Sequence, residues 1–283
     1  MNHRLALYQH VSQQCSWEIT HHYSTSFSTA IRMLHRDLRH AICAIYGFVR
    51  VADEIVDSFH AYDKQQLLHD FEKATYQAIA QGISTNPVLQ AFQQTVRQYD
   101  ISIHLIEAFF HSMYLDLEKN TYRIRTELDT YIYGSAEVVG LMCLCIFCEG
   151  NKQKYDELQD AARALGSAFQ KVNFLRDIQA DYHELKRSYF PAFAAKGMLD
   201  EEAKQEIEKD IEQEFARGLE GIRRLPPKSR FGVYVAYRYF YALFQKIRRT
   251  APEKIMQQRI RIPNYHKLMI MLRASIRHQL NVI

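Results

Sequence analysis

Two pairs of aspartates, each pair separated by three residues, are the side chains in this sequence best suited to bind a metal ion. They are Asp53 and Asp57 in the segment DEIVD, and Asp177 and Asp181 in the segment DIQAD. On a helix, residues i and i+4 lie on one face about 6 Å apart, so two carboxylates there repel unless a cation lies between them. Mg²⁺ prefers oxygen ligands and commonly bridges carboxylates to substrate phosphates. The spacing therefore predicts two magnesium-binding elements, with Mn²⁺ as an alternative ion.

Polar and basic residues one helical turn from each pair indicate an anionic ligand. Arg50 precedes Asp53 by three residues and is expected on the same helical face. Gln170 and Asn173 extend the second pair upstream at helical spacing, and the other faces of that stretch carry large apolar residues. Such a stripe is hard to explain as a solvent-exposed face. One aspartate pair alone would be a common surface feature, whereas two pairs with these neighbours are much more specific.

This combination suggests magnesium-assisted loss of diphosphate from an allylic substrate. The metal would offset charge on the leaving group, and Arg50, Arg176 and Arg259 could donate charge-assisted hydrogen bonds to it. The carbocation left behind needs a dry cavity lined by aromatic rings, because water would quench it. The 16 Phe and 18 Tyr residues are compatible with such a cavity.

The elements that hold these residues are expected to be helices. The 283 residues include only 10 Gly and 6 Pro, and apolar residues recur at three- and four-residue steps. Helical periodicity is weak before residue 20 and clear from about Ser28, and Phe190-Pro191 is expected to close the longest helix. We predict helices over 38–56, 64–82, 87–99, 101–119, 127–149, 153–187, 200–223, 228–249 and 262–280. Without a repeat, low-complexity tract or long linker, residues 1–283 are expected to form one all-α domain.

Composition and charge narrow the class of protein. The net charge of +4 is too small to indicate nucleic-acid binding. The longest apolar run, Val138–Cys148, is about half the ~20 residues of a membrane-spanning helix, and no secretory signal is visible. We expect a soluble, cytoplasmic protein, with peripheral membrane contact as an option. A basic cluster near the C-terminus is expected to be a solvated face; it comprises Arg248, Arg249, Lys254, Arg259, Arg261 and Lys267.

The five cysteines do not suggest a disulfide framework, since their number is odd and the chain is not a short secreted one. Cys143, Cys145 and Cys148 lie close together, but they fall in an apolar helical stretch and lack a second ligand pair at zinc spacing. We expect buried or half-buried thiols.

Three segments resemble the signatures of the squalene/phytoene synthase family. The first runs from Ser24-Thr25-Ser26-Phe27 to the segment 44–57, which contains the first aspartate pair. The second is the tyrosine-rich segment 131–140. The third is the segment 165–181, followed by Arg187-Ser188-Tyr189-Phe190-Pro191. The three segments occur in the family's order and extend through most of the chain.

The resemblance implies a single-domain isoprenoid-synthase fold, a helical bundle around a central cavity. It implies that Asp53, Asp57, Asn173, Asp177 and Asp181 bind Mg²⁺ through the substrate diphosphates. The four aspartates are then catalytic together with Tyr131, whose ring would lie near the reacting carbons. The residues expected around the diphosphates are Ser24, Ser26, Arg50, Arg176, Arg259, Gln170 and Asn173, and those expected along the cavity are Phe27, Tyr46 and Tyr241.

The family joins two prenyl diphosphates head to head into a cyclopropyl diphosphate, which is then ionised and rearranged. Proton loss gives phytoene from two C20 units or dehydrosqualene from two C15 units, and hydride from NADPH gives squalene. The segments 134–142 and 169–177 are most similar to bacterial phytoene synthases, which favours phytoene formation from geranylgeranyl diphosphate. Two departures stand out: Glu137 occupies a position where the family usually has glycine, and Asp53-Glu54 replaces a common Asp-Asp.

Three alternatives stay open. A C30 synthase would act on farnesyl diphosphate, with NADPH needed only for squalene. A non-catalytic relative would act as a binding or assembly protein, although such relatives usually lose acidic residues that are retained here. A head-to-tail elongase would normally carry two adjacent aspartates followed by a third, and that motif is absent. No nucleic acid and no obligate protein partner is inferred.

Overall fold

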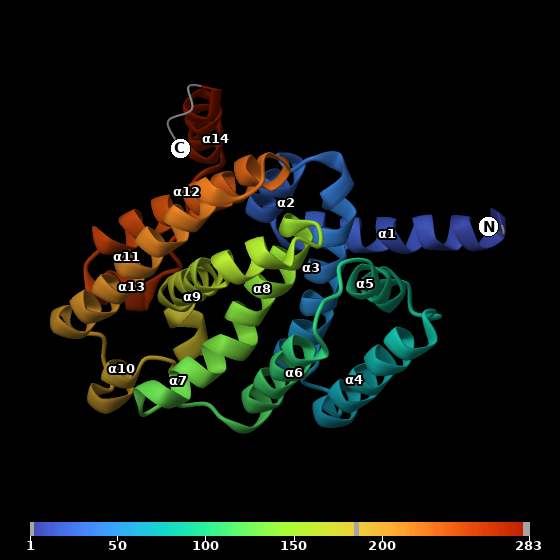
Figure 1. Ribbon diagram of the computed structural model, residues 1–283. Helices are drawn as coiled ribbons and strands as arrows, with labels where there is room; N and C mark the ends of the chain where they lie inside the picture. Colours follow the sequence, from blue (N-terminus) through green and yellow to red (C-terminus); the bar gives the residue numbers. More distant parts are fainter. Residues whose placement is uncertain (1–2, 184–186, 280–283) are drawn as a thin grey trace.

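The computed structural model describes residues 3–183 and 187–279, and almost all of them belong to helices (Figure 1). In chain order these are α1 (His3–Tyr23), α2 (Thr25–Arg32), α3 (Arg36–Asp57), α4 (Lys64–Gln81), α5 (Pro87–Gln98), α6 (Ile103–Glu118), α7 (Arg125–Ile132), η1 (Tyr133–Glu137), α8 (Val138–Cys148), α9 (Lys152–His183), α10 (Pro191–Lys196), α11 (Glu201–Arg224), α12 (Pro227–Arg248), α13 (Pro252–Gln257) and α14 (Asn264–Gln279). The prediction of an all-α, single-domain bundle is confirmed. Over the described ranges, the one β-type pairing is an isolated bridge between Thr121 and Ser188.

Several helices begin and end where the sequence supplies capping residues. Side-chain oxygens of Asp63, Asn86 and Asp200 accept hydrogen bonds from backbone N–H groups in the first turns of α4, α5 and α11. Pro87 is the first residue of α5, where its missing N–H costs no hydrogen bond. Gly82 ends α4 with φ of 71°, a conformation that glycine adopts without strain. These local signals explain why the predicted bounds agree closely here.

The predicted end of the longest helix is wrong, and the short helices α10 and α13 were not predicted. α9 ends at His183, and Arg187 lies beyond it in irregular structure, so the predicted helix over 153–187 is too long; residues 184–186 lie outside the described ranges. Pro191 also opens the short helix α10, because proline is favoured at the first helical position. The C-terminal helix begins at Asn264, and the short helix α13 before it was not predicted.

α1 shows why the periodicity is weak before residue 20. Its buried positions are occupied by small polar residues, Ser12, Ser16 and Thr20, instead of large apolar ones. The hydroxyls of Ser12 and Thr20 donate to backbone carbonyls one turn upstream, which satisfies them inside the protein. A Cβ atom added to Gly47 of α3 would lie 3.2 Å from the Ser16 Oγ, so the two helices approach closely.

The predicted helix over 127–149 is continuous but contains one π turn, η1, between α7 and α8. Glycines at this level let neighbouring backbones approach: a Cβ on Gly166 would lie 2.8 Å from the carbonyl oxygen of Ala136, and one on Gly140 would lie 2.9 Å from that of Ala162. π turns inside α-helices are frequent at functional sites, and Tyr131 lies two residues before the start of this one.

Of the helices described, one stretch, Arg125–Cys148, is long and apolar enough to cross a membrane. Half of its most apolar window is buried inside the protein, and the stretch contacts α3, α6 and α9. These contacts are those of a core helix.

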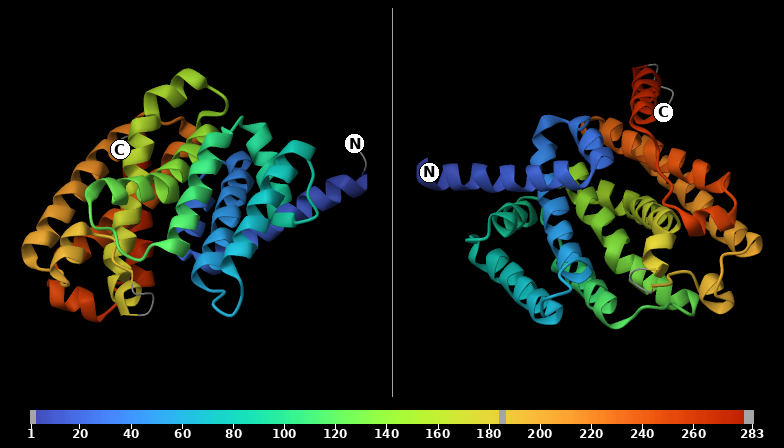
Figure 2. Two further views of the ribbon diagram at one scale, coloured as in Figure 1. Left: turned by 90° about the horizontal axis from the view of Figure 1, so that it is seen from below. Right: turned by 180° about the vertical axis from the view of Figure 1, so that it is seen from behind.

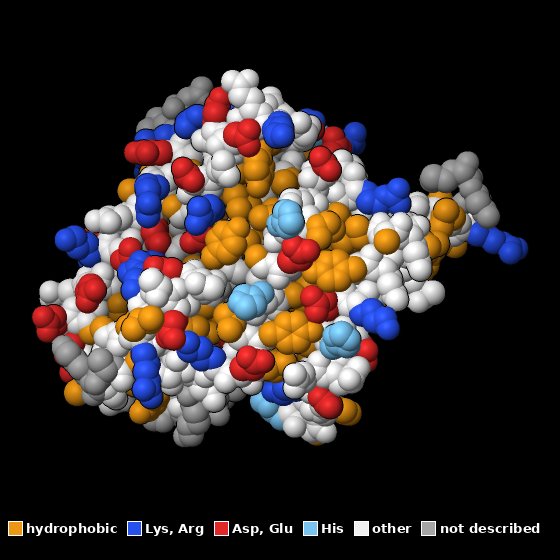
Figure 3. All heavy atoms as spheres, turned by 60° about the horizontal axis from the view of Figure 1, so that its bottom comes forward, with side chains coloured by type: hydrophobic (Ala, Val, Ile, Leu, Met, Phe, Trp, Pro, Cys, Tyr) orange, Lys and Arg blue, Asp and Glu red, His pale blue; other side chains and the backbone are white. Residues whose placement is uncertain are grey.

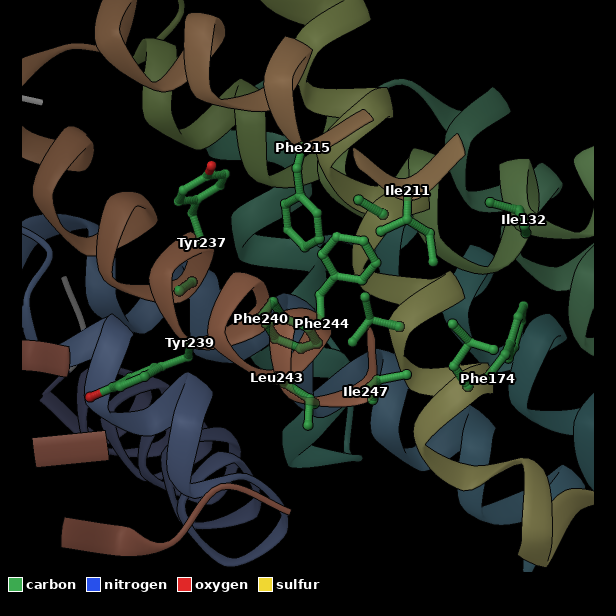
Figure 4. Packing of buried hydrophobic residues seen from close by; sticks show 14 of the residues in the cluster. Ile132, Phe174, Ile211, Phe215, Tyr237, Tyr239, Phe240, Leu243, Phe244 and Ile247 are labelled. Atoms are coloured by element: carbon green, nitrogen blue, oxygen red, sulfur yellow. The ribbon is translucent and has the colours of Figure 1, made fainter. Parts of the chain in front are cut away.

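Two apolar clusters surround the centre of the bundle. In one, the rings of Phe48 and Phe92 stack with their centroids 3.8 Å apart, joining α3 to α5. In the other, Phe215 of α11 and Phe244 of α12 face each other (Figure 4). α1 and α14 project from the body of the bundle (Figures 1 and 2). On the face seen in Figure 3, acidic and basic side chains are interspersed with hydrophobic ones.

Candidate active site

A cavity of about 940 Å³ lies between α2, α3, α8, α9, α11 and α12. Asp53 and Asp57 of α3 and Asp177 and Asp181 of α9 all line it. The volume is near the upper end of the range for small-molecule sites. The structure therefore brings both predicted aspartate elements to the wall of one cavity.

Along both α3 and α9, the residues that line the cavity change from apolar to polar. On α9 the lining residues run from Leu158 and Leu165 to Gln170 and then Asp181. At 1.5 Å per residue, Leu158 and Asp181 are about 35 Å apart along the helix axis. The lining residues of α3 change in the same direction, from Ile42 and other apolar side chains to the first aspartate pair. The site thus combines a charged end with a long apolar hollow.

Asp177 lies between two guanidinium groups. The Nε atoms of Arg176 and Arg259 are 3.0 Å and 2.6 Å from its Oδ1. Both arginines line the cavity, as do Ser24 and Ser26. The arrangement places the predicted diphosphate-binding cations at the charged end.

Arg50 pairs with Glu54 and lies 4.0 Å from the Oδ2 of Asp53. Its guanidinium also stacks over the ring of Tyr23, 4.5 Å from the ring centroid. Glu54, where the family often has aspartate, thus serves as the partner that holds Arg50 beside the cavity. This departure leaves both outer aspartates of the motif on the cavity wall.

Arg187 connects the ends of three helices. Its Nη1 donates to the Oδ1 of Asp57 at 2.8 Å, and its Nη2 donates to the carbonyl oxygen of Asp116 at 3.0 Å. Its backbone N–H donates to the carbonyl oxygen of Asp181 at 2.8 Å. The hydroxyl of Tyr131 donates to the Oδ2 of Asp116 at 2.7 Å. A continuous polar network therefore runs from Tyr131 to the first aspartate pair.

Sequence reasoning did not assign Asp116 or Arg187 to the site. Arg187 belongs to the third signature, but no role followed from its position. Asp116 lies outside every motif, and its signal is a single acidic residue in the apolar run 113–117 of a helix. A lone acid in such a run is common enough that spacing alone did not distinguish it.

Three carboxyl groups at this end have raised pKa values. Burial raises the pKa of Asp53 to about 7, and the nearby carboxylate of Asp57 adds to the shift. Burial also raises the pKa of Asp116 to about 7, against the opposing effect of Arg187. The pKa of Asp181 rises to about 7 through burial and the neighbouring Asp177. Concentrated negative charge of this kind favours a bound cation.

We expect divalent-metal affinity to increase from pH 6 to pH 8. A carboxyl whose pKa is raised in the folded state binds protons more tightly there than in the unfolded chain, so metal-free stability falls as pH rises from about 4 to about 7. Metal ions compete with those protons and bind better as they leave. Mn²⁺ titrations at several pH values measure how metal affinity changes with pH. Unfolding in the presence of a chelator measures how metal-free stability changes with pH. A flat pH dependence of both would contradict the assigned carboxyl environment.

The donor set fits a hard divalent cation. All the expected ligands supply oxygen, and the Oδ1 of Asn173 is buried, lines the cavity and has no hydrogen-bond partner. Across residues 3–183 and 187–279, no three His, Cys, Asp or Glu side chains are already grouped as a metal site. Binding of Mg²⁺ here would need phosphate oxygens and water to complete its shell.

Aromatic rings form part of the cavity wall. Tyr131 is 3% exposed and stacks with Tyr189 at a centroid distance of 5.5 Å. The ring of Phe27 lies 5.9 Å from that of Tyr46 and 5.4 Å from that of Phe240. Burial and the neighbouring Asp116 raise the pKa of Tyr131 well above its usual range. Tyr131 is therefore a neutral phenol at physiological pH.

The prediction that Tyr241 lines the cavity is wrong. Its ring lies 5.4 Å from Phe215 and 5.6 Å from Tyr237, and it is not among the lining residues. The residues of α12 that line the cavity include Tyr239 and Phe240. Each residue rotates about 100° around a helix, so a small error in position moved the assignment to the face that packs on α11.

The basic C-terminal cluster does not form one solvated face. Arg248 is exposed and pairs with Glu212 on the surface, as expected. Arg259, Arg261 and Lys267 also line the cavity, as the resemblance implied for Arg259, and of these three Arg259 and Arg261 are exposed as well. The fold brings this segment back across the charged end, which linear charge patterning could not show.

The structure also shows the surroundings of Glu137, of a third aspartate pair and of the cysteines. Glu137 forms an ion pair with Arg163 of α9, the Nε–Oε2 distance being 2.7 Å, so it joins η1 to α9. Asp156 and Asp160 of α9 form a third aspartate pair at the same spacing, which we had not singled out, and both are exposed. The cysteines are buried or half-buried, as predicted.

Comparisons with known proteins identify the family of this chain. The family model for squalene/phytoene synthases matches residues 20–266. Phytoene synthase from Arthrospira platensis is 26% identical, with 92% of this chain and 91% of the relative covered. Phytoene synthase 3 from Zea mays is also 26% identical, and the alignment covers 92% of this chain but 64% of that protein. A solved dehydrosqualene synthase shares the fold, with a TM-score of 0.83 at 18% identity and coverage of 96% and 98%. The match over 20–266 establishes that this chain belongs to the squalene/phytoene synthase family of head-to-head prenyltransferase enzymes.

Proposed function

We propose that this enzyme condenses two geranylgeranyl diphosphates head to head into phytoene through a cyclopropyl diphosphate. The observation that carries the proposal is the position of both aspartate pairs at the polar end of one long cavity whose remaining wall is apolar. Relatives named phytoene synthase, similar over about nine tenths of this chain, support the choice of product.

The charged end would bind the two diphosphates. Arg176 and Arg259 can donate to phosphate oxygens in place of their present partner, Asp177. The carboxylates of the two pairs, with Asn173, would hold Mg²⁺, which when bound offsets the charge on the leaving diphosphate. Each half-reaction releases one diphosphate and one proton.

The apolar part of the cavity would hold the two prenyl chains and exclude water from the cations. Tyr131 is fixed by its hydrogen bond to Asp116 and remains a neutral phenol. Its electron-rich face can stabilise positive charge on a nearby carbon. It therefore acts through its ring, and not as a phenolate base.

A product assay tests this proposal. With Mg²⁺ and geranylgeranyl diphosphate, we expect the purified enzyme to give phytoene without NADPH, and at least tenfold more product than from farnesyl diphosphate, since each missing methylene loses apolar contact. Chromatography of the hydrocarbons, with and without NADPH, measures chain length and reduction together. C30 hydrocarbon as the main product, or no C40 product at all, would contradict the proposal.

A further inference from the structure

The C-terminal helix α14 exposes a continuous apolar stripe. Its members recur at helical spacing on one face; they are Tyr265, Leu268, Met269, Leu272 and Ile276. Their exposed fractions range from 46% to 74%. Contiguous apolar surface of this kind on a protein usually marks an interaction site.

The stripe lies opposite the face by which α14 is attached. Ile270 and Ala274 are buried, and α14 packs against α12. At 100° per residue, these two positions lie about half a turn around the helix from the stripe. Lys267 fixes the start of the helix by donating to the hydroxyl of Thr25 at 2.8 Å. α14 is therefore held by one face and presents the other outward, and it projects from the bundle (Figures 1 and 2).

The charge around the stripe favours an anionic surface. The sequence of α14 contains no Asp or Glu, whereas it contains Lys267 in the attached first turn and Arg273 and Arg277 further along. Arg273 is exposed and, by helical position, borders the stripe beside Met269. A helix with an apolar face flanked by basic residues is typical of interfacial membrane helices. A second copy of the chain would bring like charges together, whereas anionic lipid headgroups attract them.

We propose that α14 docks the enzyme on anionic lipid membranes, with its apolar stripe inserted at the level of the headgroups. The segment leading into α14 and the first turn of α14 border the active-site cavity, which Arg261, Ile262 and Lys267 line. Docking would thus bring a lipid phase beside the cavity that we assign to prenyl chains. Binding to vesicles needs no substrate, so its test is independent of the proposed reaction.

Vesicle flotation of the full-length protein tests the proposal. We expect binding to phosphatidylcholine vesicles that contain about a third phosphatidylglycerol, and weaker binding to phosphatidylcholine alone or at high salt. The double variant Leu272→Glu, Ile276→Glu should bind at least tenfold more weakly, because each side chain loses its apolar transfer energy. Arg273→Gln should weaken binding to the anionic vesicles about fivefold.

The matched control is Ile83→Glu, Ile124→Glu, which changes two isoleucines that are 47% and 56% exposed but lie away from α14. It should bind within about twofold of the wild type, and thermal unfolding should show that all variants are folded. Absence of wild-type binding, or equal binding by the wild type and the α14 double variant, would overturn the proposal. The proposal would also be overturned if the wild type formed a dimer that the α14 double variant disperses, and the wild type did not bind vesicles. If the α14 double variant does not fold, vesicle binding by Arg273→Gln and by the wild type at several salt concentrations tests the proposal instead.

Discussion

The double variant Asp53→Asn, Asp181→Asn is expected to lower kcat/KM for hydrocarbon formation by roughly a thousandfold or more. It removes one carboxylate from each aspartate pair, and charge stabilisation by bound metal and oriented donors supplies effects of this size or larger. Asparagine keeps the volume of the side chain, so the shape of the cavity should be preserved. Product formation at saturating Mg²⁺ measures the loss.

The same variant should be at least as stable as the wild type when no metal is present. Both carboxyl groups have pKa values raised to about 7, so at pH 8 each ionised group opposes folding, and neutral asparagine removes that cost. Lost activity with retained or increased stability is the pattern expected of residues kept for function. Lost activity that tracks a loss of folded protein would point to a structural role instead.

The chain offers a matched control for this experiment. Asp156 and Asp160 have the same spacing on the same helix, α9, but both are exposed. Asp156→Asn, Asp160→Asn should leave kcat/KM within about twofold, since exposed charges contribute little. Equal activity losses in the two double variants, or full product formation by Asp53→Asn, Asp181→Asn, would contradict the assignment of the metal ligands.

Replacing Arg187 by methionine should lower both stability and activity. The side chain is 8% exposed and pairs with Asp57, and it lies 3.9 Å from the Oδ1 of Asp116, whose side chain is 5% exposed. Removing Arg187 leaves the buried carboxyl group of Asp116 without its counter-charge, which typically costs about 3 kcal/mol. Denaturant unfolding of Arg187→Met measures this loss, and product formation should fall as Asp57 and Asp116 lose their positions.

A surface ion pair provides the comparison. Arg248 and Glu212 are 44% and 46% exposed and lie 3.0 Å apart. Arg248→Met should change the free energy of unfolding by less than about 1 kcal/mol, because solvent screens exposed pairs. If Arg187→Met were no more destabilising than Arg248→Met, the network from Tyr131 to Asp57 would not hold the charged end together.

Much of the fold follows from local physics that the sequence displays. α3 was predicted because its buried residues are large and recur at helical spacing, and α4 and α5 begin where capping residues stand. α1 was indistinct because small hydroxyl residues can pack closely against Gly47 without an apolar stripe. The end of α9 was placed too late because no proline or glycine stands between Asp181 and Arg187.

The candidate site could be predicted where side chains of one chemical type recur along one face of a helix, as in the two aspartate pairs. It was not predictable where residues meet only in three dimensions. Asp116 is recognisable only once Tyr131 and Arg187 lie beside it, and Lys267 only once the chain returns to the cavity. The misplaced Tyr241 shows that a shift of one or two residues on a helix changes which face is assigned.

Anomalous diffraction from crystals grown with Mn²⁺ and a non-hydrolysable prenyl thiodiphosphate tests the central claim most directly. Metal peaks beside Asp53 or Asp57 on α3, and beside Asp177 or Asp181 on α9, with the diphosphate between the two helices, are the predicted result. A diphosphate bound elsewhere, or metal peaks that contact neither pair, would contradict the assignment of this cavity as the active site.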